Sequence, residues 1–159
     1  MRRYQVWGQF PKNLEDCGYA PCMRKDPVVL KQGILQNYEY SILHNGNAPT
    51  AYICIPKEHI LFQYGTLELL DKVLIYTHSY CLGVHEGVTY VGPLCMFGAE
   101  KIWVGWDYAH SHDMQTVYNF CGKVWSVPAI MEDVRKGVSA LSLLNAESAV
   151  ICSLRNGGF

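Results

Sequence analysis

YEYSILHNGNAPTAYICIP, residues 38–56, contains two stretches rich in β-branched and aromatic residues, separated by a turn signal. The first stretch alternates in polarity, and the pair Asn45-Gly46 then favours a reversal of the chain. The second stretch resumes the β-pattern until Pro56 stops it. The segment therefore predicts a β-hairpin, with a connection over 44–50 that is longer than a two-residue turn.

Further elements are predicted on both sides of this hairpin. They are a short helix over 66–74, β-rich segments over 82–93 and 101–110, a helix over 126–145, and a terminal strand and tail over 146–159. In both helices apolar residues recur every three or four positions, and Ser126 can cap the second. Residues 1–33 are expected to be irregular.

The length of 159 residues fits one domain with a single core. We therefore expect one compact α+β domain over 1–159, with an antiparallel or mixed sheet and two or three helices. Its β-rich core over 34–125 carries the candidate site.

The composition excludes several classes of protein. With 13 Lys+Arg, 14 Asp+Glu and a formal charge of −1, the chain lacks the excess positive charge that binds the phosphates of duplex nucleic acid. No apolar run is long enough to span a bilayer and no signal peptide opens the chain, so we expect a cytoplasmic protein. The seven cysteines are odd in number and contain no CxxC pair, which argues against a disulfide framework.

WVGWDYAHSHD, residues 103–113, gathers two Trp, one Tyr, two His and two Asp in one segment. A packed core would favour aliphatic residues here, so the segment predicts a binding or catalytic site. Strand alternation places Trp103, Gly105 and Asp107 on one face.

The segment LGVHEGVTY, residues 82–90, adds a second polar group under the same alternation. It places His85, Gly87 and Thr89 on one face, with Gly87 leaving room for a ligand or a β-bulge. If the two strands align, both groups surround one patch. His59 is expected to reach the same pocket, whereas His44, His78 and His112 are expected at the surface.

The spacing of Asp107, His110 and Asp113 leaves three interpretations open. The three side chains could hold zinc, manganese or iron. Alternatively, a carboxylate orients a histidine for acid–base chemistry or ligand binding, with His85, Asp107 and His110 as catalytic candidates. A purely structural hydrogen-bond network is the third interpretation.

AYICIPKEH, VHEGVTY and WVGWDYAHSHD together resemble an uncharacterised family of bacteriophage and prophage proteins, over residues 51–113. The family pattern is GY(V/I)-x-(V/I)P ending in His, then VHGGLTY, then W-x-GFDCAH-x-GD. The positions that fit the pattern are His59, His85, Gly87, Thr89, Trp103, Gly105, Asp107, His110 and Asp113. The departures are Ala51, Glu86, Trp106, Tyr108 and His112, and Glu86 stands where the family has Gly. The resemblance implies a ligand-binding site and a phage setting inside the host cell, but no reaction.

Three functions fit these observations. The first is binding of a nucleotide-like small ligand, which sequesters a host defence signal, with Trp103 or a Tyr stacking the base. The second is a hydrolase of a nucleotide or phosphoester, either assisted by a divalent metal or using His and Asp as acid and base. The third is a protein-binding inhibitor of a host enzyme. A homo-oligomer would supply the Lys and Arg that these motifs lack, and no P-loop, dinucleotide, hydrolase-elbow or zincin motif occurs.

Overall fold

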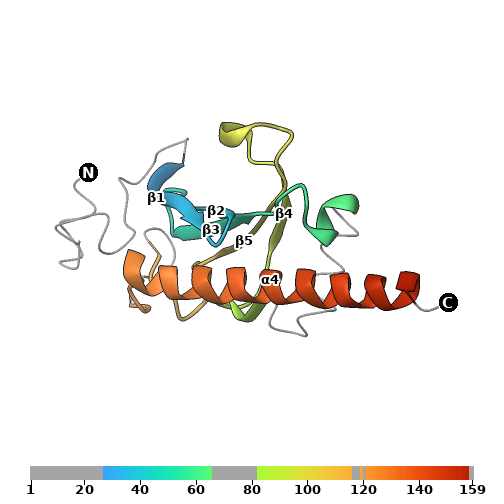
Figure 1. The fold of residues 1–159 in the computed structure, drawn as a ribbon. Coiled ribbons are helices and arrows are strands. Elements are labelled where there is room, and N and C mark those ends of the chain that lie inside the picture. The colour runs from blue at the N-terminus through green and yellow to red at the C-terminus, as the bar shows by residue number, and fades with distance from the viewer. Residues whose placement is uncertain (1–26, 66–81, 116–118, 120, 158–159) are drawn as a thin grey trace.

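The computed structural model describes residues 27–65, 82–115, 119 and 121–157 (Figure 1). Its elements are β1 (Val28–Leu35), β2 (Tyr38–His44), β3 (Pro49–Cys54), η1 (Ile60–Gln63), β4 (Tyr90–Gly92), η3 (Cys95–Phe97), β5 (Trp103–Asp107) and α4 (Val127–Gly157). The two η elements are 3-10 helices.

The five strands form one antiparallel sheet in the order β1-β2-β3-β5-β4. The α+β class and the antiparallel sheet are therefore confirmed. The described residues contain one α-helix, not two or three, and the helix expected over 66–74 lies outside the described residues.

The hairpin predicted from residues 38–56 is confirmed as β2 and β3, which pair from His44↔Pro49 to Tyr40↔Ile53. Its connection is tighter than expected because both strands extend into the predicted loop. The Asn45 side chain accepts hydrogen bonds from the backbone N–H groups of Asn47 and Ala48, at 2.9 and 3.0 Å, and so folds the turn on itself.

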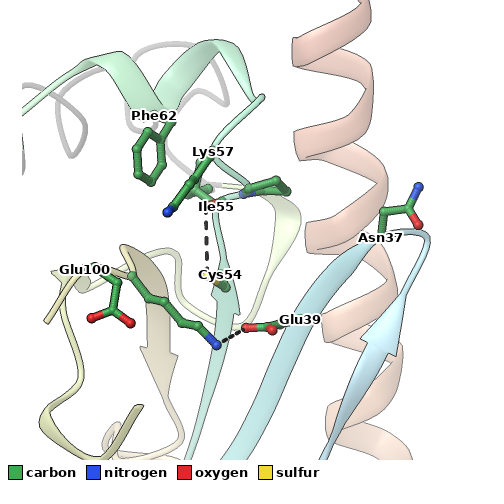
Figure 2. Close-up of a pocket in the computed structure, with 9 residues that line it drawn as sticks. Asn37, Glu39, Cys54, Ile55, Lys57, Phe62 and Glu100 are labelled. Atoms are coloured by element: carbon green, nitrogen blue, oxygen red, sulfur yellow. Dashed lines mark hydrogen bonds and ion pairs between the residues drawn. The ribbon is translucent and has the colours of Figure 1, made fainter. Parts of the chain in front are cut away.

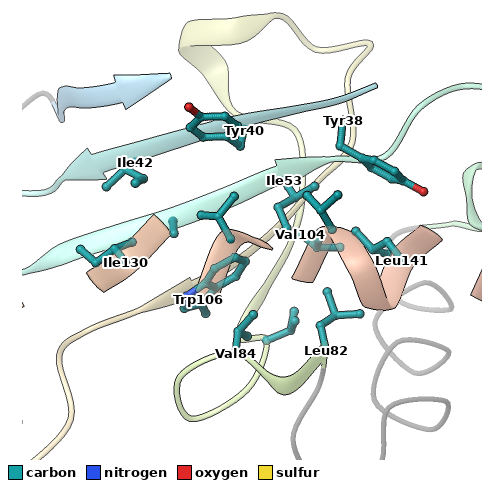
Figure 3. Close-up of a cluster of buried hydrophobic side chains, with 14 of the residues drawn as sticks. Tyr38, Tyr40, Ile42, Ile53, Leu82, Val84, Val104, Trp106, Ile130 and Leu141 are labelled. Carbon is teal, nitrogen blue, oxygen red and sulfur yellow. The ribbon is translucent and has the colours of Figure 1, made fainter. Parts of the chain in front are cut away.

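One face of the sheet packs against α4 and forms the core (Figures 1 and 3). Alternate residues of three neighbouring strands supply this face, because their side chains share one side of the pleat. They are Tyr38, Tyr40 and Ile42 of β2, Ala51 and Ile53 of β3, and Val104 and Trp106 of β5. The buried stripe of α4 that meets them is Ile130, Val134, Val138 and Leu141.

The helix predicted over 126–145 is confirmed but continues to Gly157, so the terminal strand predicted over 146–159 is wrong for residues 146–157, and the last two residues lie outside the described ones. Ala146, Glu147 and Ala149 favour helix, and no Pro or Gly interrupts the chain from 138 to 156. The helix begins after Ser126, whose hydroxyl accepts a hydrogen bond from the Ala129 N–H at 3.2 Å. No helix in the described part of the chain has both the length and the apolar character needed to cross a membrane.

Two predicted segments differ in their strand content. Part of the region expected to be irregular, residues 28–33, belongs to β1, which turns into β2 through Gln36 and Asn37 at φ 50° and 69°. Conversely, only Tyr90–Gly92 of the predicted strand over 82–93 pairs as a strand. Within the 101–110 segment, Trp103–Asp107 are confirmed as strand β5.

Candidate functional site

Three histidines surround the carboxylate of Asp113, which is 0% exposed. Its Oδ2 lies 2.8 Å from Nε2 of His85 and 3.2 Å from Nδ1 of His110. Its Oδ1 accepts a hydrogen bond from the Trp125 indole at 2.8 Å, and His112 Nε2 lies 3.9 Å from the same oxygen. We call these five residues the histidine cluster.

Two turns bring the histidines to Asp113. His85 lies in the turn Val84–Gly87, closed by a 3.1 Å hydrogen bond from the Gly87 N–H to the Val84 carbonyl. Glu86 and Gly87 have φ values of 53° and 85°, so the predicted strand breaks here and its alternation does not apply. In the second turn the Asp113 N–H bonds the His110 carbonyl at 2.9 Å, and the His110 N–H bonds Asp113 Oδ2 at 3.0 Å.

A third segment, residues 121–125, delivers Trp125. The Lys123 N–H bonds the His112 carbonyl at 2.7 Å, and the Lys123 carbonyl accepts from the Met114 N–H at 2.8 Å. Gly122 makes this approach feasible, because a Cβ there would lie 2.1 Å from the carbonyl carbon of Asp113. The site is thus assembled from backbone contacts between two loops.

Aromatic rings hold the His85 imidazole in place. Tyr108 stacks on it with 4.9 Å between ring centroids and 4° between planes, and Trp125 lies at 4.6 Å. The Tyr108 hydroxyl donates to Asp133 of α4 at 2.7 Å and accepts from the Trp106 indole at 2.9 Å. His85 is therefore tied through Tyr108 to both the sheet and the helix.

Asp113 carries its charge inside the protein. Burial alone would raise the pKa of Asp113, but hydrogen bonds from His85, the His110 backbone and Trp125 outweigh it and lower that pKa below its usual value. Burial, with the neighbouring Asp133 carboxylate, raises the pKa of Tyr108, so this hydroxyl stays protonated. The carboxylate is thus an ionised acceptor enclosed by donors.

The rim of the cluster is polar. Asp107 accepts from the Thr89 hydroxyl at 3.2 Å and from the Ala109 N–H at 3.0 Å. His112 Nε2 lies 3.2 Å from Glu86 Oε1. The Lys123 ammonium lies 3.7 Å from the centroid of the Trp125 ring. Of the residues predicted for the site, the structure therefore brings together His85, Gly87, Thr89, Asp107, His110 and Asp113.

Two predicted residues lie elsewhere, and a third is covered by another side chain. His59 is buried beside α4, where its Nε2 lies 2.8 Å from the Leu141 carbonyl. At a rise of about 1.5 Å per residue, Leu141 is about 12 Å along the helix from Asp133, which contacts the cluster through Tyr108. Trp103 shares a sheet face with Asp107 but is four residues away, about 13 Å along a strand. The space above Gly105 is taken by Tyr52, whose ring would be 2.3 Å from a Cβ there.

Sequence reasoning missed several members of the site. Trp125, Lys123 and Asp133 lie outside the matched motifs, and no local pattern connects them with Asp113. His112 is exposed as expected, but it has partners in Glu86 and Asp113. The surface assignment of His44 is wrong, because its side chain is 0% exposed. His78 lies outside the described residues.

Two sets of side chains in the described chain could hold a metal ion, and both include His85. One is His85, His110 and Asp113, and the other is His85, Glu86 and His112. The predicted set differs from both, because it contains Asp107, whose Oδ1 lies 3.9 Å from Nδ1 of His110, and lacks His85.

Two hollows lie beside the face of the sheet that α4 does not cover. One, of about 210 Å³, is lined by Cys54, Phe62 and Glu39 (Figure 2). Lys101, which also lines it, forms an ion pair with Glu39 at 2.8 Å. The other, of about 350 Å³, extends from this ion pair to Trp103. Neither is lined by a member of the histidine cluster.

No protein-family model, curated protein or solved structure matches this chain.

Proposed function

We propose that the protein binds a small phosphate-bearing, nucleotide-like ligand at the histidine cluster. The observation that carries this proposal is the convergence of three imidazoles on Asp113, with the Lys123 ammonium 3.7 Å from the centroid of the neighbouring Trp125 ring. The motifs themselves contain few cations, which phosphate usually recruits. Lys123, contributed by a separate loop, supplies one, and the imidazoles supply polar ring nitrogens.

The orientation of His110 supports the same proposal. Its Nδ1 lies 3.2 Å from Asp113, and the two ring nitrogens lie on different sides of the imidazole. Its Nε2 is therefore turned away from the buried carboxylate, and 28% of the side chain is exposed. An orienting carboxylate behind an exposed imidazole is an arrangement that presents the outer ring nitrogen to a ligand. In the phage setting that the resemblance implies, the ligand is a nucleotide signal of host defence, which the protein sequesters.

The direct test is calorimetric titration of the full chain with adenosine monophosphate and with inorganic phosphate. We expect saturable binding that Lys123→Ala weakens about tenfold. This factor corresponds to the loss of one charge-assisted contact that contributes roughly 1.4 kcal/mol to the binding free energy. Lys57→Ala, which removes an exposed lysine distant from the cluster, is the matched control. Absence of binding to both probes, together with no small molecule retained in native mass spectrometry, contradicts the proposal.

Hydrolysis of the bound phosphoester is a second candidate, favoured by the pairing of His110 with Asp113. Here His110 Nε2 takes a proton from water as the water oxygen bonds to phosphorus. The ester P–O bond then breaks, and the leaving oxygen receives the proton that His110 took up. Release of inorganic phosphate or of a nucleoside by wild-type protein, lost in His110→Gln, distinguishes hydrolysis from sequestration.

A further inference from the structure

We infer that His85, His110 and Asp113 bind one divalent first-row transition-metal ion, with Trp125 as a positioning residue. This inference deepens the proposed function and rests on it for the placement of the ligand. It assigns His85 as the metal ligand in place of Asp107.

The spacing of the ligand atoms fits such an ion. Bonds of about 2.0–2.1 Å in a tetrahedral site place neighbouring ligand atoms about 3.3 Å apart. Asp113 Oδ2 lies 2.8 Å from His85 Nε2 and 3.2 Å from His110 Nδ1. All three ligand atoms lie within 4.8 Å of one another. Small side-chain rotations therefore suffice to admit the ion.

The surroundings of these ligands orient them as metal sites require. The Trp125 indole N–H donates a hydrogen bond to Oδ1 of Asp113 at 2.8 Å, which leaves Oδ2 as the oxygen facing the imidazoles. Tyr108 fixes the plane of the His85 ring, and Asp133 holds the Tyr108 hydroxyl at 2.7 Å. Such outer contacts set the rotamer of a ligand and raise metal affinity.

The ligand types select the class of ion. Two imidazole nitrogens and one carboxylate oxygen suit Zn²⁺, Fe²⁺, Co²⁺ or Mn²⁺ better than Mg²⁺ or Ca²⁺, which favour oxygen ligands. Three protein ligands leave a coordination position for an oxygen of the phosphate-bearing ligand. The alternative set with Glu86 and His112 is less constrained, because both these side chains are about half exposed, at 45% and 54%.

The test uses the full chain after treatment with a chelator and dialysis. Titration with Zn²⁺ by calorimetry and with Co²⁺ by visible absorption should give one ion per chain. His110→Ala and Asp113→Asn should each weaken binding about 100-fold or more, as expected for a lost ligand when outer-shell changes already cost 10- to 100-fold. His110→Ala alters a partly exposed side chain, and circular dichroism checks that each variant is folded.

Two further variants separate the competing sets and the positioning role. His112→Ala should leave Co²⁺ affinity within about threefold, because this residue is not a ligand of the proposed set. Trp125→Phe should weaken affinity about 10- to 100-fold while leaving the Co²⁺ absorption spectrum unchanged, because the ligands stay the same. Absence of stoichiometric ion in wild type, or a greater loss in His112→Ala than in His110→Ala, overturns the inference.

The two proposals fail separately. If no ion binds but adenosine monophosphate does, the metal inference is overturned and the proposed function stands. If one ion binds through His110 and Asp113 but neither phosphate probe does, the metal site stands and the proposed ligand is wrong.

Discussion

His44 is a completely buried imidazole at the end of β2, and burial lowers its pKa from 6.5 to about 4. Its Nδ1 accepts a hydrogen bond from the Gly46 N–H at 3.0 Å, which requires that nitrogen to be unprotonated. In the unfolded chain this imidazole takes up a proton below about pH 6.5. The unfolded state thus binds more protons between pH 6.5 and about 4, so the free energy of unfolding decreases as pH falls through this window.

Replacing His44 with Gln should remove this share of the pH dependence. Wild type should lose roughly 1.4 kcal/mol per pH unit through this group across the lower part of the window. Urea unfolding at several values between pH 7 and pH 5 measures the slope in both proteins. Equal slopes in wild type and His44→Gln would mean that His44 is already protonated in the folded state.

Tyr108 joins the site to the core through its hydroxyl. Tyr108→Phe keeps the ring beside His85 but leaves Asp133, 7% exposed, and the Trp106 indole without this partner. We expect the free energy of unfolding to fall by about 2–3 kcal/mol, because a buried charged acceptor loses a donor. The control Tyr90→Phe removes a hydroxyl that contacts the Pro93 carbonyl in an exposed position, and should cost less than about 1 kcal/mol. If urea unfolding showed similar decreases in the free energy of unfolding for both variants, the Tyr108 hydroxyl would not join the site to the core as described.

At the scale of elements, the loop over 121–125 depends on a glycine. Gly122→Ala places a Cβ 2.1 Å from the backbone of Asp113, which no side-chain rotation relieves. We expect the loop to be displaced, with loss of the bond between Trp125 and Asp113 and destabilisation of about 2 kcal/mol or more. Gly65→Ala is the matched control, because nothing lies within 4 Å of a Cβ at that position. Tryptophan fluorescence and urea unfolding compare the two variants, and equal behaviour contradicts the argument.

An element could be predicted from the sequence where the residues that determine it lie within the element itself. The β2–β3 hairpin and the start of α4 carry turn and capping residues in the segment itself, so both were predicted. The β1–β2 turn uses Gln36 and Asn37, a weak turn signal, and Gly33 interrupts the alternation of β1, so that hairpin was missed. In AVICSL, residues 149–154, apolar and β-branched residues resemble a strand, and only continuity with the preceding helix decides otherwise.

The site was predictable in part for the same reason. His110 and Asp113 form a local turn, and spacing alone indicated their contact. His85 lies 2.8 Å from Asp113, although the strand expected for it is a turn, with Glu86 at φ 53° where the family pattern that the segments resemble has Gly. Trp125 contacts Asp113 because two loops pair through Asp113 and Lys123. No sequence pattern within either loop predicts that pairing.

At the scale of the whole molecule, the histidine cluster connects four parts of the described chain. It joins the turn before β4, the end of β5, the loop before α4 and, through Tyr108, the helix itself. An ion bound there contacts groups that separate when the protein unfolds. Ion binding is therefore expected to stabilise the folded domain as a whole and not only the loops.

Scanning calorimetry of the chelator-treated chain with and without Zn²⁺ measures this coupling. At a free concentration of about 100 times the dissociation constant, the ion should add about 2.7 kcal/mol to the free energy of unfolding. For a domain of this size that corresponds to a rise in Tm of roughly 5–10 °C. Excess chelator should reverse the rise, and His110→Ala should abolish it at the same Zn²⁺ concentration. A rise that persists in His110→Ala would place the stabilising ion at a different set of side chains, because removal of one of three ligands cannot leave the affinity of this site unchanged.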